Sequence, residues 1–210
     1  MAWAKGARGR RLPTALARDK WDALVDGAAG GEAGRRWDEI AVRDQAVVSL
    51  FLFSGLRSNE LAGLTVGQVD WNAGTIRLIG KGNKERIAAV GGDALEYLEA
   101  YLELRPDADD AGEIPDTAPL FRSRKGGHLT NSQVRRLVKA AGQAAGLDGT
   151  GHGRQRIHPH LLRAAHATQL HAKGADLVTI ADQLGHEDLG TTRRYLAISV
   201  EKRRDQVRDM

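Results

Sequence analysis

The chain has 210 residues, enough for one large domain or two small ones, with 41% hydrophobic residues and a modest formal net charge of +4. It contains no cysteine, which excludes disulfides, thiol catalysis and cysteine-ligated metals and is compatible with a reducing cytoplasm. No apolar run approaches the roughly 20 residues that a membrane-spanning helix needs, and the basic N-terminus lacks the apolar segment of a secretory signal.

The first elements in the chain are predicted to be helical. A first helix is expected with Thr14 or Asp19 as its cap, followed by a glycine-rich break over residues 27–34. Residues 40–53 predict a largely buried helix that stops at Gly55.

A short helix over residues 58–62 should follow, and then the hydrophobic period changes. Residues 75–79 and 86–90 flank the turn at residues 80–84, a pattern typical of a β-hairpin. Helical periodicity returns over residues 93–104.

The second half of the chain predicts a short strand at Leu120–Phe121 and a basic helix over residues 131–145. Three further helices are expected at residues 159–172, 176–184 and 191–198. Together the elements predict an α+β fold that is predominantly helical and contains one small antiparallel β-sheet.

The charged residues are unevenly distributed. Residues 93–116 hold nine acids and one base, whereas residues 117–147 hold six bases and no acid. This predicts that one surface meets a polyanion; two oppositely charged solvated faces are the alternative. The residues that we expect to bind this polyanion are Arg122, Arg124, Lys125, Arg135 and Arg136.

Five short motifs together carry the groups that metal-free phosphodiester chemistry needs, namely cations, acids and bases, and an oxygen nucleophile. They are Ser54-Gly55-Leu56-Arg57, Gly80-Lys81-Gly82-Asn83-Lys84, His160-Leu161-Leu162-Arg163, Leu184-Gly185-His186 and Thr191-Thr192-Arg193-Arg194-Tyr195. In order and spacing they resemble the catalytic domain of the tyrosine recombinase (phage integrase) family, from about Leu12 to the C-terminus.

The resemblance implies a basic arm or linker remnant at residues 1–12 and a tyrosine recombinase catalytic domain at residues 13–210. It implies a cytoplasmic site-specific recombinase that cleaves and rejoins double-stranded DNA through a 3′-phosphotyrosyl intermediate, without metal, ATP or other cofactor, as a tetramer assembled on the DNA. The alternatives are a type IB topoisomerase or telomere-resolvase-like strand transferase, and a non-catalytic DNA-binding derivative. The complete residue set argues against the last.

Tyr195 is the candidate nucleophile. A phenol with a pKa near 10 needs nearby cations or a base to react. The alternative is an ordinary packing tyrosine, as we expect for Tyr97 and Tyr101, which lie four residues apart on an amphipathic helix. Tyr195 differs because it follows His186 by nine residues, as in the family's final motif.

Arg57 and Arg163 are the candidate phosphate clamps, because a planar guanidinium can donate two parallel hydrogen bonds to phosphate oxygens. A surface salt bridge from Arg57 to Glu60 is the alternative, although Glu60 can also buttress Arg57. His160 lies three residues before Arg163, so a helix that begins at Pro159 places both on one face, where His160 can exchange protons. A capping or core histidine is the alternative.

Lys81, in the hairpin turn, is the candidate general acid for the leaving 5′ oxygen, because an ammonium proton is transferable. Lys84 competes for this role, and the resemblance favours Lys81. The resemblance also implies that His186 donates to the scissile phosphate. No metal site is expected, since no carboxylate lies between His152 and His171 and no H-E-x-x-H spacing occurs.

Three features depart from the family pattern. Ala164 follows the motif arginine where histidine is usual, with His166 nearby, and Asn59 stands in place of the common serine before Glu60. Family members also usually carry an N-terminal helical domain that closes over the DNA, whereas about a dozen residues precede the expected catalytic domain here.

Overall fold

The computed structural model of the chain describes residues 16–30, 38–79, 85–109, 112–147 and 156–186. The predicted hairpin turn with Lys81 and the predicted last helix with Tyr195 lie outside these residues. Within the described part, helices dominate and a three-stranded antiparallel sheet accompanies them, which confirms the predicted fold class.

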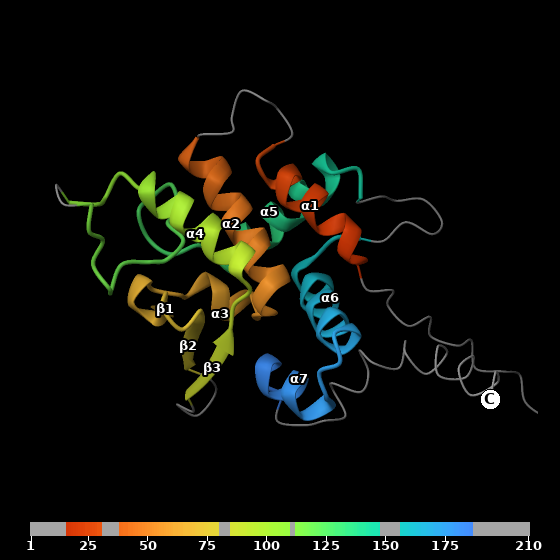
Figure 1. Ribbon diagram of the computed structural model, residues 1–210. Coiled ribbons are helices and arrows are strands. Elements are labelled where there is room, and N and C mark those ends of the chain that lie inside the picture. Colours follow the sequence, from red (N-terminus) through yellow and green to blue (C-terminus); the bar gives the residue numbers. More distant parts are fainter. Residues whose placement is uncertain (1–15, 31–37, 80–84, 110–111, 148–155, 187–210) are drawn as a thin grey trace, which may run out of the picture.

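Helix α2 (Glu39–Ser54) lies at the centre of the helices (Figure 1). It begins where the Asp38 side chain accepts the N–H of Ile40 at 2.9 Å, and it ends at Gly55, whose φ of 67° lies in the left-handed region. Residues 46–52 are all buried. A helix that is apolar on every side must be covered on every side, so α2 organises the core.

Other helices cover α2 and extend the core. Those in contact with it are α1 (Trp21–Ala28), α4 (Gly92–Glu103), α5 (Asn131–Ala144) and α6 (Pro159–Ala172). Helix α1 follows a short 3₁₀ turn, η1 (Arg18–Lys20), and the residue before it is Lys20. Of the two predicted caps, Asp19 is wrong because it lies inside η1, and Thr14 lies outside the described residues.

The sheet has the order β1-β2-β3, with β1 (Val69–Asp70), β2 (Thr75–Ile79) and β3 (Glu85–Ala89). The predicted hairpin is confirmed, with β3 one residue earlier than expected. Strand β1 follows the short 3₁₀ turn η2 (Val66–Gln68) and was not predicted, since two residues are too few to show a period of two.

Side chains on β2 and β3 alternate between a buried and an exposed face. Ile76 and Leu78 pair with Ala88 and Arg86 respectively, and these four residues share the inner face. Strand β3 is an edge of the sheet and contacts α7 (Leu177–Leu184), which lies below α6 in Figure 1.

The predicted short strand at Leu120–Phe121 is wrong. Both side chains are buried, but the N–H of Leu120 donates to the carbonyl of Leu64 as a single loop contact at 2.8 Å. Isolated bridges at Pro119 and Arg122 flank the pair without forming a ladder. Leu120 and Phe121 are apolar because they are buried in the core, and they do not belong to a strand.

The remaining helices agree closely with expectation. Helix α3 (Ser58–Ala62) and α6 have the predicted bounds, and Asp176 caps α7 by accepting the N–H of Thr179 at 2.7 Å. Within the parts of the chain that the structure describes, no helix has the length and apolar character to cross a lipid bilayer.

Candidate active site

Arg57 is placed at the start of α3 by the turn that ends α2. Gly55 reverses the chain, Leu56 is buried in the core, and Arg57 is then the residue before the first turn of α3. Its side chain remains 46% exposed. The core thus fixes the backbone of this arginine while its guanidinium faces outward.

Glu60 holds Arg57 from within the same helix turn. One oxygen, Oε1, accepts from Nη1 of Arg57 at 2.8 Å, and the other, Oε2, accepts from the Arg57 backbone N–H at 2.7 Å. Oε2 also accepts from Nη2 of Arg86 at 2.8 Å. Burial by itself raises the pKa of Glu60, but the Arg57 N–H and the Arg86 guanidinium outweigh burial and hold the pKa below its ordinary value. Glu60 is therefore a carboxylate at neutral pH.

Arg163 reaches the same region from α6. The His158 side chain caps this helix by accepting the N–H of Leu161 at 3.2 Å, so the capping histidine is His158 rather than His160. Arg163 is buried, and its Nη1 donates to the carbonyl of Gly55, two residues before Arg57, at 2.5 Å.

Three arginines meet at the C-terminal end of α7. Its last carbonyl groups lie at successive residues: Gln183 accepts from Arg86 at 2.7 Å, Leu184 from Arg163, and Gly185 from Arg57 at 2.6 Å. The last carbonyls of a helix lack partners within the helix and carry a partial negative charge. This helix end therefore gathers guanidinium groups from α3, β3 and α6 around one point.

His186 follows directly after these carbonyls. Gly185 ends α7 with a φ of 62°, and the N–H of His186 returns to the carbonyl of Ala181 at 2.9 Å. Burial and, after it, the nearby charges of Arg163, Arg57 and Arg86 together lower the pKa of His186 to about 4. The imidazole is therefore neutral at pH 7 and can donate one hydrogen bond.

The structure thus brings together Arg57, Arg163 and His186, three of the predicted catalytic residues, and places a fourth, His160, on α6 three residues before Arg163. His160 is exposed and Arg163 is buried one turn further along α6. Tyr97 and Tyr101 pack against the hydrophobic core, and Tyr101 is fully buried, so both have the position expected of packing tyrosines.

The predicted DNA-binding residues lie along α5 and the turn before it. Four of them, Arg124, Lys125, Arg135 and Arg136, are exposed. The fifth, Arg122, is half-buried, and its Nε lies 3.8 Å from Oδ2 of Asp107. Helix α5 contacts α3, and the Asn131 side chain donates a hydrogen bond to Asn59. Arg135 lies one turn after Asn131, on the same face of α5.

Two polar residues of this region, Arg86 and Gln183, were missed by sequence reasoning. A signal existed for Arg86, since alternation along β3 puts it on the inner face with Ala88, where a cation needs a carboxylate. Gln183 gave no signal of its own, because its partners on β3 and α2 are remote in sequence.

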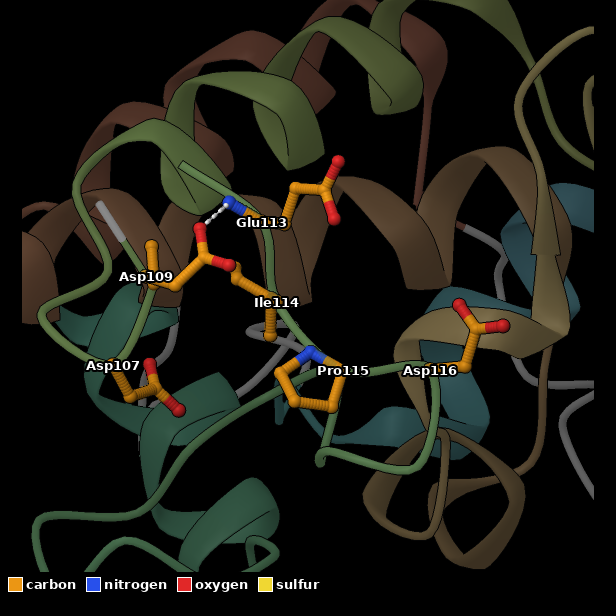
Figure 2. Close-up of a pocket in the computed structure, with 7 residues that line it drawn as sticks. Asp107, Asp109, Glu113, Ile114, Pro115 and Asp116 are labelled. Atoms are coloured by element: carbon orange, nitrogen blue, oxygen red, sulfur yellow. Dashed lines mark hydrogen bonds between the residues drawn. The ribbon is translucent and has the colours of Figure 1, made fainter. Parts of the chain in front are cut away.

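A separate pocket lies in the acidic loop after α4 and is lined by residues 107–109 and 113–116 (Figure 2). Within it, Asp109 accepts the N–H of Glu113 at 2.8 Å. A pocket lined by Asp107, Asp109, Glu113 and Asp116 repels phosphate, so it does not suit the polyanion expected from the sequence. Among the described residues, no group of three or more histidine, aspartate and glutamate side chains is placed to hold a metal ion.

Residues 16–202 match the family described as the Phage integrase family, and the chain belongs to it. Proteins named Tyrosine recombinase XerC are similar: that of Azotobacter vinelandii is 40% identical over 186 residues, and that of Syntrophus aciditrophicus is 38% identical over 167 residues. These matches cover 89% and 79% of this chain but 56% and 52% of the relatives. The chain thus spans about half the length of the curated relatives that it matches.

Solved structures with the same fold include recombinases. The XerH site-specific recombinase bound to palindromic difH substrate, in a post-cleavage complex, has a TM-score of 0.76 and 26% identity over 96% of this chain and 54% of that chain. The XerA recombinase has a TM-score of 0.72 and 27% identity over 91% of this chain and 61% of its own.

Proposed function

We propose that this chain is the strand-transfer domain of a site-specific DNA recombinase. One observation carries the proposal: Arg57, Arg163 and His186, from three separate elements, meet at the end of α7. Two guanidinium groups beside a neutral imidazole suit a phosphodiester, because a five-coordinate phosphorus carries its added charge on oxygens that such donors can reach.

The proposed reaction exchanges one phosphodiester for another. The Tyr195 oxygen bonds to phosphorus, the bond from phosphorus to the 5′ oxygen breaks, and a 3′-phosphotyrosyl link and a free 5′ hydroxyl result. His160 takes the phenol proton and Lys81 supplies a proton to the leaving oxygen. The reverse attack by a 5′ hydroxyl rejoins the strand, so the bond energy is conserved without ATP.

Double-stranded DNA is the proposed partner. The XerH structures are described as bound to difH substrate before and after cleavage. In this chain, Arg135 and Arg136 are exposed on α5, which contacts α3, and Arg124 and Lys125 are exposed in the turn before α5. Exposed cations of this kind can contact a DNA backbone beyond the scissile phosphate. Because the substrate is DNA, the proposed location is the cytoplasm.

The proposed domain extends over residues 13–210, after the arm at residues 1–12, and we propose that it works as a tetramer on DNA. The tail after Ser199 has one thin apolar stripe, formed by Val200 and Val207. Such a stripe supports little association by itself, since helix stability comes mainly from packing. We expect light scattering to find a monomer without DNA and a larger assembly with it.

The test uses a pool of nicked duplex oligonucleotides with randomised arms. The nick releases a short fragment after cleavage and traps the covalent adduct, which is recovered on a denaturing gel and sequenced. Tyr195→Phe should bind the same DNA and form no adduct, while the control Tyr97→Phe should react normally. An adduct that maps to Tyr97 or Tyr101 would contradict the assignment.

A second arm of the test adds EDTA. Side chains supply the cations in the proposed mechanism, so the adduct should form at an unchanged rate. A rate that falls with EDTA and recovers with zinc or magnesium would contradict the mechanism and favour a histidine-bound metal.

A further inference from the structure

Arg86 lies on the inner face of strand β3, at the edge of the sheet. Its register partner is Leu78, and its side chain is 16% exposed. Nη2 donates to Glu60 Oε2 at 2.8 Å and Nη1 donates to the carbonyl of Gln183 at 2.7 Å. Both ends of this guanidinium are therefore bound to the protein, one on α3 and one on α7.

These contacts close a ring with Arg57. Glu60 holds both arginines through its two oxygens, and Arg57 in turn donates to the carbonyl of Gly185, two residues after Gln183. The ring passes from α3 to β3, then to the end of α7, and back to α3. Displacing any member shifts the others, because each guanidinium has two fixed partners.

Gly185 shows how closely the ring is packed. A Cβ atom added there would lie 2.5 Å from Nε of Arg86, and its φ of 62° already disfavours other residues. The arginine thus fills the space beside the turn that carries His186.

The Gln183 side chain fixes the same helix end to the sheet. Its amide accepts the N–H of Ala89 at 2.9 Å and donates to the carbonyl of Ala89 at 2.8 Å, as a neighbouring strand would. It also donates to the carbonyl of Ser54, the last residue of α2, at 2.9 Å. Side chain and backbone of one residue therefore tie α7 to β3 and α2.

We propose that Arg86 and Gln183 are positioning residues that hold the C-terminal turn of α7, and with it His186, in register with Arg57. The inference rests on the proposed strand-transfer function. The proposal gives neither residue a contact with the phosphate: the Arg86 guanidinium joins Glu60 to Gln183, and the Gln183 amide is bound to backbone groups. Their effect on the reaction comes from geometry, which strand transfer needs within a fraction of an ångström.

The first test compares Arg86→Gln and Arg86→Lys with the control Arg77→Gln, an exposed arginine on the neighbouring strand β2. Single-turnover cleavage is measured at saturating protein on the nicked duplex most enriched from the randomised pool. Arg86→Gln should slow cleavage about 10- to 100-fold with an unchanged dissociation constant for DNA. Arg86→Lys keeps the charge and should retain an intermediate rate, and Arg77→Gln should match the parent chain.

A second readout does not depend on activity. Burial is the main reason that the pKa of His186 lies at about 4, and the charge of Arg86 contributes with those of Arg163 and Arg57. In an NMR titration, Arg86→Gln should therefore raise the pKa of His186, whereas Arg86→Lys should leave it near that of the parent. Gln183→Leu should leave the charges unchanged, slow cleavage about 10-fold and speed hydrogen exchange at the Ala89 N–H.

The outcomes separate the inference from the proposed function. A parent chain that yields no adduct contradicts the function, and the titration and exchange results then decide the inference alone. Variants that fold, cleave at the parental rate and leave both His186 and Ala89 unchanged overturn the inference. Cleavage that falls only in proportion to DNA affinity also overturns it, because Arg86 would then act as a DNA ligand.

Discussion

Two sites in the molecule each pair one carboxylate with two arginines: the Glu60 corner, with Arg57 and Arg86, and the Asp107 corner, with Arg105 and Arg122. The two corners differ in how exposed their arginines are. At the Glu60 corner, Arg57 keeps 46% of its side chain exposed. At the Asp107 corner, Arg105 is fully buried, with Asp107 on one side and the carbonyls of Pro119 and Leu120 on the other. Arg57 is therefore a cation that faces outward, whereas Arg105 fixes a loop.

The pKa shifts of the two carboxyl groups reflect this difference. At Asp107, which is 32% exposed, the hydrogen bond from Arg105 is the main reason for a pKa below the ordinary value. At Glu60, which is 12% exposed, burial opposes the charged form and several donors must overcome it. Glu60 is therefore the carboxylate whose charged form depends more on its donors.

The largest expected effect is the loss of stability when the buried Arg105 is removed. Arg105→Ala should lower the free energy of unfolding by about 3–5 kcal/mol, because the carbonyls of Pro119 and Leu120 lose their donor and a large void remains. Urea denaturation measures this loss. Cleavage per folded molecule should be unchanged, and a specific loss of cleavage would break the comparison.

Removing the exposed Arg57 should instead affect DNA cleavage strongly and stability little. Arg57→Ala should slow DNA cleavage about 100- to 1000-fold, because the phosphate is left with one donor fewer, while stability changes by about 1 kcal/mol or less. Single-turnover cleavage and urea denaturation are measured on the same preparation. A variant that cleaves normally would show that Arg57 only pairs with Glu60.

A pH series tests His166, a buried histidine that packs beside Gly55, two residues before Arg57. Burial lowers the pKa of His166 to about 4, although its Nδ1 hydrogen bond with the Leu52 carbonyl at 2.8 Å opposes the shift. The His166 imidazole takes up a proton at about pH 6.5 in the unfolded chain but only at about pH 4 in the folded protein. The free energy of unfolding should therefore fall by about 1.4 kcal/mol per pH unit as the pH falls from 6.5 to 4. Urea midpoints at each pH measure the slope.

The matched variant is His166→Phe. The phenylalanine ring should fill the space that the histidine occupies beside Gly55, but it carries no titrating group. Its stability should fall less steeply between pH 6.5 and 4 than that of the parent. An equal slope in both proteins would assign the acid sensitivity to another group.

The smallest effect concerns the exposed arginines of α5. Each arginine that no longer neutralises a phosphate should reduce the slope of log affinity against log salt by about 0.9, so Arg135→Ala with Arg136→Ala should reduce it by about 1.8. Binding to a duplex at several salt concentrations measures the slope. An unchanged slope would place the DNA on another surface.

Sequence patterns predicted the local structure well where one element contained the whole signal. Gly55 and Gly185 end their helices in the left-handed conformation, and α3 and α6 have the predicted bounds. The misses were Asp19 as a cap and Leu120–Phe121 as a strand. In each case a tertiary contact or a neighbouring turn decided a short segment whose own preference was weak.

The sequence by itself determined the helical fold class and the hairpin, and it supplied Arg57, His160, Arg163 and His186 as candidate site residues, because motif order and spacing are properties of the chain. Only the tertiary structure decided that three arginines share the end of α7, and that Arg86 and Gln183 support it. Their partners lie up to 129 residues away along the chain. Such pairings depend on how α2, β3 and α7 pack, and no local periodicity encodes that packing.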